Sequence, residues 1–240
     1  YEMVEEPDGS LPCLRPMSEI AGRLATQEGA RHLGKTSGGR GVLLGGVPGI
    51  ERGHVVIIGA GVVGTNAARI AVGMGARVTM LDTNRARLAQ VDDQFGVNVT
   101  TLVSSAYHLE AALRAADLVV GAVLRPGKRA PVVVSREDLA LLNRGSVLVD
   151  VAIDQGGCFE TSRPTTHDEP TYLVDGVVHY AVTNMPGIDA WSSTRALTSV
   201  TLPFVAAIAD HGLDGACERM PALRKGLCID RGRERCGEAA

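Results

Sequence analysis

Short apolar runs alternate with longer segments of helical periodicity over most of this chain. The apolar runs span residues 54–58, 77–81, 97–102, 118–123 and 147–151. Apolar side chains three or four positions apart, which is the spacing of one helix face, mark the segments between them: residues 62–74, 85–95, 106–115 and 135–142. Short buried strands that alternate with helices form a parallel sheet covered on both faces. The pattern therefore predicts an α/β domain with a doubly wound parallel sheet.

Two long helices are predicted, one before the sheet segments in the sequence and one after them. Residues 16–33 place Ile20 and Leu24 four positions apart, and the proline near the first turn loses no hydrogen bond there. Residues 192–210 keep apolar side chains at the same spacing, which predicts a long amphipathic helix. Within the sheet domain, Ser135 is the expected N-cap of the predicted helix 135–142, because a serine hydroxyl can accept a backbone N–H of the first turn.

A glycine-rich turn follows the first predicted strand and opens the next predicted helix. Residues 59–64 read Gly-Ala-Gly-Val-Val-Gly, and Asp82 ends the following strand, 21 residues after Gly61. Gly59 permits a tight turn, Gly61 lets a pyrophosphate approach the backbone, and Gly64 lets the helix lie close to the sheet. This context is typical of a Rossmann-type dinucleotide site, and a helix that starts with glycines by chance is the weaker interpretation.

The carboxylate of Asp82 favours NAD as the cofactor. It can accept hydrogen bonds from the hydroxyls of the adenine ribose, and its charge repels the 2'-phosphate of NADP. Arg85 and Arg87 lie close by in the sequence and could offset that repulsion. The alternative interpretation, which is at least as good for Arg85, is that these are solvated charges on a helix.

Two further polar residues lie where predicted strands end. Asp154 comes just after the apolar run 147–151, and Asn184 follows another apolar run. In open α/β sheets, ligands bind at the carboxyl ends of the strands. Asp154 is therefore a candidate site residue, and the Asn184 amide could hold the nicotinamide or its ribose. A plain loop-capping role is about as good an interpretation of either residue alone, and Asp150 is more simply explained as a structural strand-end residue.

Composition favours small-molecule chemistry in a reducing compartment. The 240 residues are 45% hydrophobic with a formal net charge of −3, and only 3% are aromatic, so neither a polyanionic partner nor a base-stacking platform is expected. Five cysteines without a C-x-x-C pair suggest no disulfide framework and no metal site, which fits the cytoplasm. We also predict no membrane partner, because the apolar runs are strand-length. The chain opens on Tyr1, so we expect the natural N-terminus to be absent.

Several segments together resemble alanine dehydrogenase over nearly the whole chain, down to about Leu227. The stretches that carry the resemblance are residues 17–23 (Met-Ser-Glu-Ile-Ala-Gly-Arg), the glycine-rich turn with residues 66–69 (Asn-Ala-Ala-Arg), residues 152–160 (Ala-Ile-Asp-Gln-Gly-Gly-Cys-Phe-Glu), residues 162–167 (Ser-Arg-Pro-Thr-Thr-His) and residues 184–186 (Asn-Met-Pro). The soluble part of proton-translocating transhydrogenase belongs to the same superfamily, but residues 154–166 resemble the dehydrogenase pattern more closely.

The resemblance implies reversible oxidative deamination of L-alanine to pyruvate and ammonium, with hydride transfer to the nicotinamide of NAD. It implies Asp154 as the catalytic residue of this chain. It also implies a homo-oligomer, a homohexamer in this family. The residues that the motif and the resemblance together assign to the NAD site are Ser18, Gly59, Gly61, Val62, Val63, Gly64, Asp82, Arg87, Ser104, Val123, Leu124, Val151, Ala152, Ile153, Asp154, Val182, Thr183, Asn184 and Met185.

The chain also departs from the family pattern. The substrate-binding arginine and lysine and the acid/base histidine of the family have no matching positions here, and we expect packing or solvated roles for the six histidines. We therefore expect a fragment or truncated relative: residues 1–37 as the end of a substrate domain with a connecting helix, 38–185 as the NAD-binding domain, and 186–240 as a return helix and a remnant of the substrate domain. A non-catalytic NAD(H)-binding protein and a transhydrogenase nucleotide-binding module are the alternatives.

Overall fold

The chain forms two compact units. A computed structural model describes residues 1–123 and 128–234. The larger unit is Glu19–Met185, and the smaller unit combines Tyr1–Ser18 with Pro186–Ala240. This grouping places most of the first long helix with the sheet. The predicted domain boundaries at residues 38 and 186 stay a prediction.

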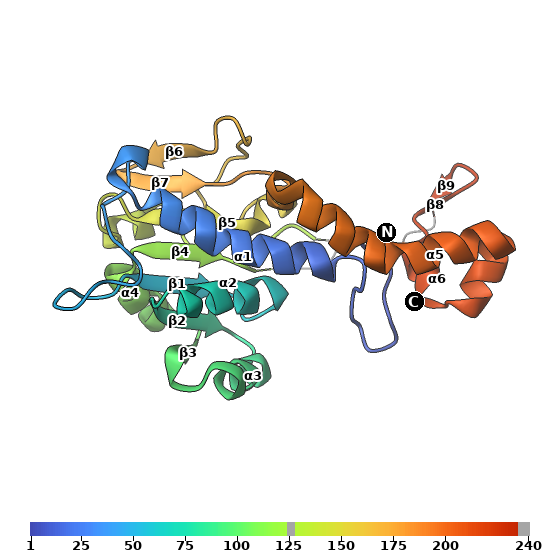
Figure 1. The fold of residues 1–240 in the computed structure, drawn as a ribbon, viewed down its shortest axis with the longest axis horizontal. Coiled ribbons are helices and arrows are strands. Elements are labelled where there is room, and N and C mark those ends of the chain that lie inside the picture. Colours follow the sequence, from blue (N-terminus) through green and yellow to red (C-terminus); the bar gives the residue numbers. More distant parts are fainter. Residues whose placement is uncertain (124–127, 235–240) are drawn as a thin grey trace. The chain divides into compact units, whose positions relative to one another are not determined.

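A seven-stranded sheet forms the core of the larger unit (Figure 1), in the order β3-β2-β1-β4-β5-β7-β6. All neighbouring pairs are parallel except β6 with β7. The strand order reverses direction between β1 and β4, which is where open α/β sheets bind dinucleotides. This confirms the predicted doubly wound sheet. The strands are β1 His54–Ile58, β2 Arg77–Asp82, β3 Val99–Val103, β4 Leu118–Gly121, β5 Val147–Asp150, β6 Thr171–Val174 and β7 Val177–Tyr180.

The helices of the larger unit begin close to where their sequences predict. Asn84 caps α3 by accepting hydrogen bonds from two first-turn amides, and Ser105 caps α4 by accepting one, from His108 N. The predicted helix 135–142 is wrong in type, because residues Glu137–Leu141 form a 3-10 helix. The N-cap position belongs to Arg136 and not, as predicted, to Ser135, although the Ser135 hydroxyl accepts a hydrogen bond from Asp138 N (3.2 Å). The α-helices are α1 Arg15–His32, α2 Val62–Gly73, α3 Arg85–Phe95 and α4 Ala106–Ala115; further 3-10 helices are Lys35–Ser37, Gly96–Asn98, Val151–Gln155 and Met185–Asp189.

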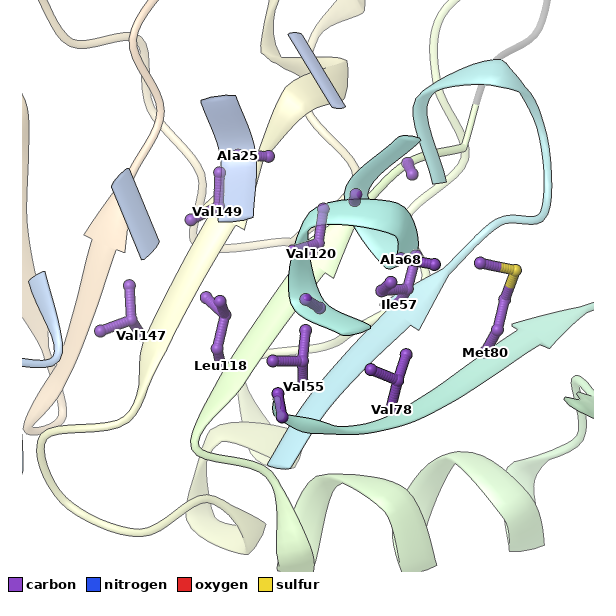
Figure 2. Packing of buried hydrophobic residues seen from close by; sticks show 14 of the residues in the cluster. Ala25, Val55, Ile57, Ala68, Val78, Met80, Leu118, Val120, Val147 and Val149 are labelled. Atoms are coloured by element: carbon purple, nitrogen blue, oxygen red, sulfur yellow. The ribbon is translucent and has the colours of Figure 1, made fainter. Parts of the chain in front are cut away.

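Alternate strand residues build two hydrophobic cores on opposite faces of the sheet. On one face, Val55 and Ile57 pack with buried side chains of α1 and α2, such as Ala25 and Ala68 (Figure 2). On the other face, Val56 and its neighbours pack with α4 and the 3-10 helix Glu137–Leu141. Burial on both faces explains why the strands read as unbroken apolar runs and not as alternating patterns.

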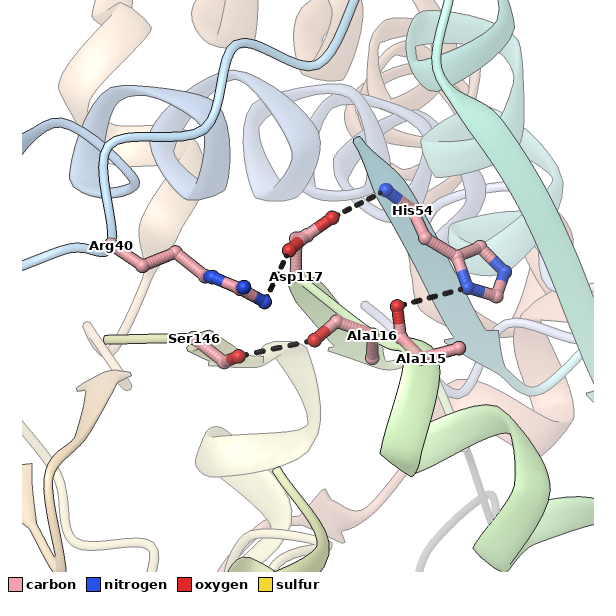
Figure 3. Close-up of polar contacts among 6 residues, drawn as sticks. All are labelled: Arg40, His54, Ala115, Ala116, Asp117 and Ser146. Carbon is pink, nitrogen blue, oxygen red and sulfur yellow. Dashed lines mark hydrogen bonds and ion pairs between the residues drawn. The ribbon is translucent and has the colours of Figure 1, made fainter. Parts of the chain in front are cut away.

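A network of hydrogen-bonded polar side chains lies at the amino ends of the strands (Figure 3). Asp117, just before β4, accepts hydrogen bonds from His54 N (2.8 Å) and from Arg40 Nη1 (2.7 Å). The His54 ring lies within hydrogen-bond distance of Ala115 O and of the Thr79 hydroxyl. Each polar group buried here therefore has a partner, as burial requires.

Three buried histidines make the stability of the larger unit depend on pH. Burial lowers the pKa of His32, His54 and His179 below the ordinary value of 6.5. As pH falls, these histidines take up protons in the unfolded chain before they do so in the folded chain. Their contribution to the free energy of unfolding is therefore fully present above about pH 6.5 and decreases below it. We expect a lower free energy of unfolding at pH 5.5 than at pH 7.5 in urea titrations. An equal or higher value at pH 5.5 would contradict the buried, neutral state of these rings.

The smaller unit contains one long helix with little burial. Its elements are α5 Ala190–Arg219, α6 Ala222–Gly226, β8 Ile229–Asp230 and β9 Arg233–Glu234. Within α5, Pro203 lies in the helix and Gly212 (φ +66°) kinks it. By length and composition alone, Met185–Arg219 is apolar enough to cross a membrane, and 6% of the apolar window is buried. The expectation that apolar stretches reach only strand length is therefore wrong here. Serine and threonine divide this helix into short apolar runs, but they add no charge, so the whole stretch stays apolar on average.

Candidate functional site

The three glycines of the turn between β1 and α2 meet three different constraints. Gly59 has φ +113°, and a Cβ there would lie 2.5 Å from Ala122 O. A Cβ on Gly64 would overlap the carbonyl oxygen of Gly59, so only glycine allows α2 to start this close to β1. A Cβ on Gly61 would meet no heavy atom within 4 Å. The space beside Gly61 is thus open, as a backbone that receives phosphates requires.

The start of α2 leaves its first-turn amides without a side-chain cap. Gly61 is the N-cap and provides no side-chain hydrogen bond, and the first turn carries no acidic residue. The positive end of the helix dipole therefore faces this open space, where it favours an anion. Behind the turn, Arg23 Nε of α1 donates to Asn66 Oδ1 (3.2 Å), and Asn66 donates to Val62 O (2.9 Å), so α1 supports the first turn of α2.

The carboxylate of Asp82 reaches the glycine-rich turn. Asp82 ends β2, which pairs with β1, and its Oδ2 accepts a hydrogen bond from Ala60 N (2.6 Å). Its Oδ1 accepts from Asn84 N (2.7 Å). Ser104 follows at the end of β3, where its N–H donates to Asp82 O (2.9 Å). An acidic group at the tip of the neighbouring strand therefore stands beside the helix terminus, as ribose recognition requires.

Asp154 and Asn184 meet although 30 residues separate them in the chain. Asp154 lies in the 3-10 helix Val151–Gln155 after β5, and Asn184 follows β7, the strand next to β5 in the sheet. Asn184 N donates to the Asp154 carboxylate at 3.2 and 3.4 Å. Asn184 holds φ +50°, a left-handed backbone that few non-glycine residues adopt and that often occurs at functional sites. The side chains of both residues are exposed.

The other predicted site residues differ in what they can offer a ligand. Ala152, Ile153, Val182 and Met185 are buried, so their side chains serve the core. Val63, Val123 and Val151 are half-buried, while Val62, Thr183 and the α3 residue Arg87 are exposed. Ser18 belongs to the smaller unit and remains a prediction, and Leu124 lies outside the described residues.

Asp150 has the structural role that its strand-end position suggested, with more hydrogen-bond donors than the sequence indicated. It is buried at the end of β5, and its carboxylate accepts hydrogen bonds from several groups of the segment after it. A carboxylate inside an otherwise apolar strand end is a signal that could have indicated this role, because a buried charge needs several donors. Over residues 1–123 and 128–234, no group of three or more His, Cys, Asp or Glu side chains is placed to hold a metal ion.

Comparisons with known proteins show which family this chain is similar to. Residues 25–236 match the family model described as "Alanine dehydrogenase/PNT, C-terminal domain". The chain is 58% identical over 232 residues to an alanine dehydrogenase of Mycobacterium tuberculosis (strain CDC 1551 / Oshkosh), covering 97% of this chain and 62% of the relative. It is 57% identical over 228 residues to that of Geobacillus stearothermophilus, covering 95% and 61%. The chain therefore spans about three fifths of the length of these relatives.

Two solved structures are also similar. An L-alanine dehydrogenase structure superposes with a TM-score of 0.95 at 53% identity, covering 99% of this chain and 66% of that one. A transhydrogenase from Sinorhizobium meliloti superposes with a TM-score of 0.69 at 26% identity, covering 80% and 55%. The similarity to the dehydrogenase is greater in all of these measures.

Proposed function

This chain belongs to the alanine dehydrogenase/PNT family, and on that premise we propose that it is the NAD-binding part of an L-alanine dehydrogenase. The observation that carries the proposal is the contact between the Asp82 carboxylate and the amide of Ala60 in the glycine-rich turn. It places a ribose-binding group beside an uncapped helix start with open space for phosphates. The transhydrogenase alternative is not favoured, because that similarity is weaker and covers less of the chain.

The residues fit a dinucleotide that lies across the carboxyl ends of β2, β1, β4 and β5. Gly61 and the first turn of α2 would hold the pyrophosphate, and Asp82 the adenine ribose. Asp154 and Asn184, on the other side of the strand-order reversal, would hold the nicotinamide ribose. When bound, NAD accepts the hydride that leaves the α-carbon of alanine.

The Asp154 carboxylate is the proposed catalytic group of this chain. In the proposed reaction, L-alanine, NAD⁺ and water give pyruvate, ammonium, NADH and a proton. As hydride leaves, the substrate becomes a cationic imine, and a carboxylate nearby stabilises that charge and orients the attacking water. The backbone N–H of Asn184 fixes the direction of this carboxylate. The resemblance implies that an acid/base histidine accepts the proton and that an arginine and a lysine bind the substrate, and none of these three has a matching position in this chain.

Asp82 provides the sharpest test of the cofactor assignment. Replacing it with alanine removes the charged acceptor to which the ribose hydroxyls would donate. Such hydrogen bonds are worth about 1.5–3 kcal/mol, so NADH affinity should fall roughly 10- to 150-fold. The preference for NADH over NADPH should narrow, because the repulsion of the 2'-phosphate disappears. Fluorescence titrations with both nucleotides measure these effects.

Asp93→Ala is the control for Asp82→Ala, because it removes an equal charge from an exposed position of α3. We expect this variant to bind NADH as the unsubstituted chain does. Absence of NADH binding by the unsubstituted chain would contradict the proposed function. For the reaction itself, alanine-dependent reduction of NAD⁺ at alkaline pH is assayed with a protein that also carries the substrate-binding segment implied by the resemblance, and there Asp154→Asn should reduce the rate about 100-fold or more.

We also propose that the protein acts as a homo-oligomer. The resemblance implies it, and α5 exposes large apolar side chains that include Leu202 (64% exposed) and Val205 (59%). Apolar surface of this kind is covered in many oligomers. Light scattering should give a multiple of the chain mass, and a monomer at micromolar concentration would contradict this proposal.

A further inference from the structure

One buried carboxylate organises the segment that carries Asp154. Asp150 is the last residue of β5, and its side chain is almost fully buried, with 1% of the residue exposed. Its oxygens accept hydrogen bonds from both ends of the segment that follows: Ala152 N (3.0 Å), Cys158 N (2.8 Å), Cys158 Sγ (3.3 Å), Phe159 N (3.3 Å) and Ser162 Oγ (2.5 Å). One side chain therefore joins the start of the segment 151–162 to its end.

The donors to Asp150 are all neutral groups. Three are backbone amides, and the others are the Ser162 hydroxyl and the Cys158 thiol. Burial and the charge of Asp150 raise the pKa of Cys158 well above its ordinary value, so the thiol keeps its proton and serves as a donor. Because a buried charge without donors is costly, the segment can fold here only with its amides turned toward the carboxylate.

The segment closes tightly around this carboxylate at Gly157. The backbone of Gly157 has φ +78°, and a Cβ there would lie 3.0 Å from Asp150 Oδ2 and 2.9 Å from Ser162 Cβ. Both the left-handed backbone and the close approach require glycine. The path of the chain between Asp150 and Ser162 is therefore determined by the carboxylate and leaves little freedom to the residues between.

Asp154 lies inside this closed segment. Asp150 is the N-cap of the 3-10 helix Val151–Gln155, and its carboxylate accepts a hydrogen bond from Ala152 N. That helix presents Asp154 toward Asn184 N on the neighbouring strand end. Displacement of the helix would move the carboxylate that the proposed function places at the nicotinamide side.

We propose that Asp150 is a positioning residue for the nicotinamide half of the site, acting through the segment that carries Asp154. This inference rests on the proposed function. It distinguishes two halves of the dinucleotide: Asp150 affects the binding of the nicotinamide riboside, whereas Gly61 and Asp82 determine the binding of the adenosine and the phosphates. ADP carries only the second half, so it separates the two effects.

Asp150→Asn is the variant that tests this inference. The amide keeps the size of the side chain but turns one acceptor oxygen into an NH₂ donor, which then faces donors such as Cys158 N or Ala152 N. One end of the segment therefore loses its attachment whichever way the amide points. We expect NADH affinity to fall about tenfold, because small misplacements of an oriented group have large effects. ADP affinity should stay within about twofold, because its contacts are distant and independent.

Asp117→Asn is the matched control. Asp117 is also a buried carboxylate that accepts a backbone N–H (Figure 3), but it lies before β4, at the amino ends of the strands. Both variants should lose stability, so both are titrated below their unfolding transitions. Only Asp150→Asn should weaken NADH selectively, and only its amides in residues 151–162 should show faster hydrogen exchange.

The outcomes separate the inference from the proposed function. The inference is overturned if Asp150→Asn leaves NADH affinity unchanged, weakens ADP as much as NADH, or behaves like Asp117→Asn. Binding of neither NADH nor ADP by the unsubstituted chain would overturn the proposed function first, and this inference with it. Selective loss of NADH with faster exchange in residues 151–162 supports both.

Discussion

Replacement of Gly61 with alanine is expected to prevent tight dinucleotide binding without disturbing the fold. Gly61 has φ −81° and ψ −164°, a backbone that alanine adopts readily, and a Cβ there would touch no protein atom within 4 Å. The added methyl group would instead occupy the space into which the pyrophosphate fits. Such overpacking typically costs about 1–3 kcal/mol, which corresponds to roughly a 5- to 150-fold weaker Kd for NADH.

The measurement pairs NADH titration with urea unfolding of the same variant. Gly73→Ala is the control, since Gly73 lies at the other end of α2 and a Cβ there also meets open space. That variant should bind NADH normally. If Gly61→Ala bound NADH as well as the unsubstituted chain does, the phosphates would not rest against this turn, and the proposed site would be wrong.

Replacement of Gly64 with alanine should have the opposite pattern, with the fold itself destabilised. A Cβ on Gly64 would overlap Gly59 O and lie 3.2 Å from Ile57 Cγ2. Backbone cannot move aside as a flexible side chain can, so α2 would have to separate from β1. We expect the free energy of unfolding to fall by about 3 kcal/mol or more, at the upper end of overpacking effects.

Urea unfolding followed by circular dichroism measures this loss. The comparison with Gly61→Ala is informative, because both substitutions add one methyl group to the same turn, three residues apart. A Gly64→Ala variant as stable as the unsubstituted chain would show that α2 does not pack against β1 as closely as described. NADH binding by the folded fraction of this variant should also weaken, since the phosphate-binding amides move with α2.

The periodicity of apolar residues predicted most of the larger unit. The five runs from 54–58 to 147–151 each overlap a strand, because side chains buried on both faces leave a continuous apolar signal. Local capping also helped, as at Asn84 and Ser105. The helix predicted at 135–142 was wrong because a five-residue 3-10 helix that is preceded by a serine and opens on acidic residues has the same local pattern as an α-helix start. The strand β6, at the edge of the sheet, was not predicted because its side chains are only partly buried.

One part of the candidate site could be predicted from the sequence, and the other part could not. The glycine-rich turn and Asp82 are recognisable because the ligand half that they hold needs a strand, a turn and a helix that are consecutive in the chain. The contact of Asp154 with Asn184 depends instead on β5 and β7 being neighbours in the sheet. Asp150 was interpreted as a plain structural residue, since its donors lie up to 12 residues away and reach it only after the segment has folded back.

By itself, the sequence determined the local elements, the dinucleotide-binding turn and the acidic residue that ends the next strand, because each of these depends on neighbours within a few residues or on one repeated unit. The tertiary structure decided which strands lie side by side, which amides face the Asp150 carboxylate and where Asp154 points. These are long-range contacts, and the same apolar pattern is compatible with several strand orders. Only the packed sheet, in which buried carboxylates such as Asp117 and Asp150 find their donors, selects one of them.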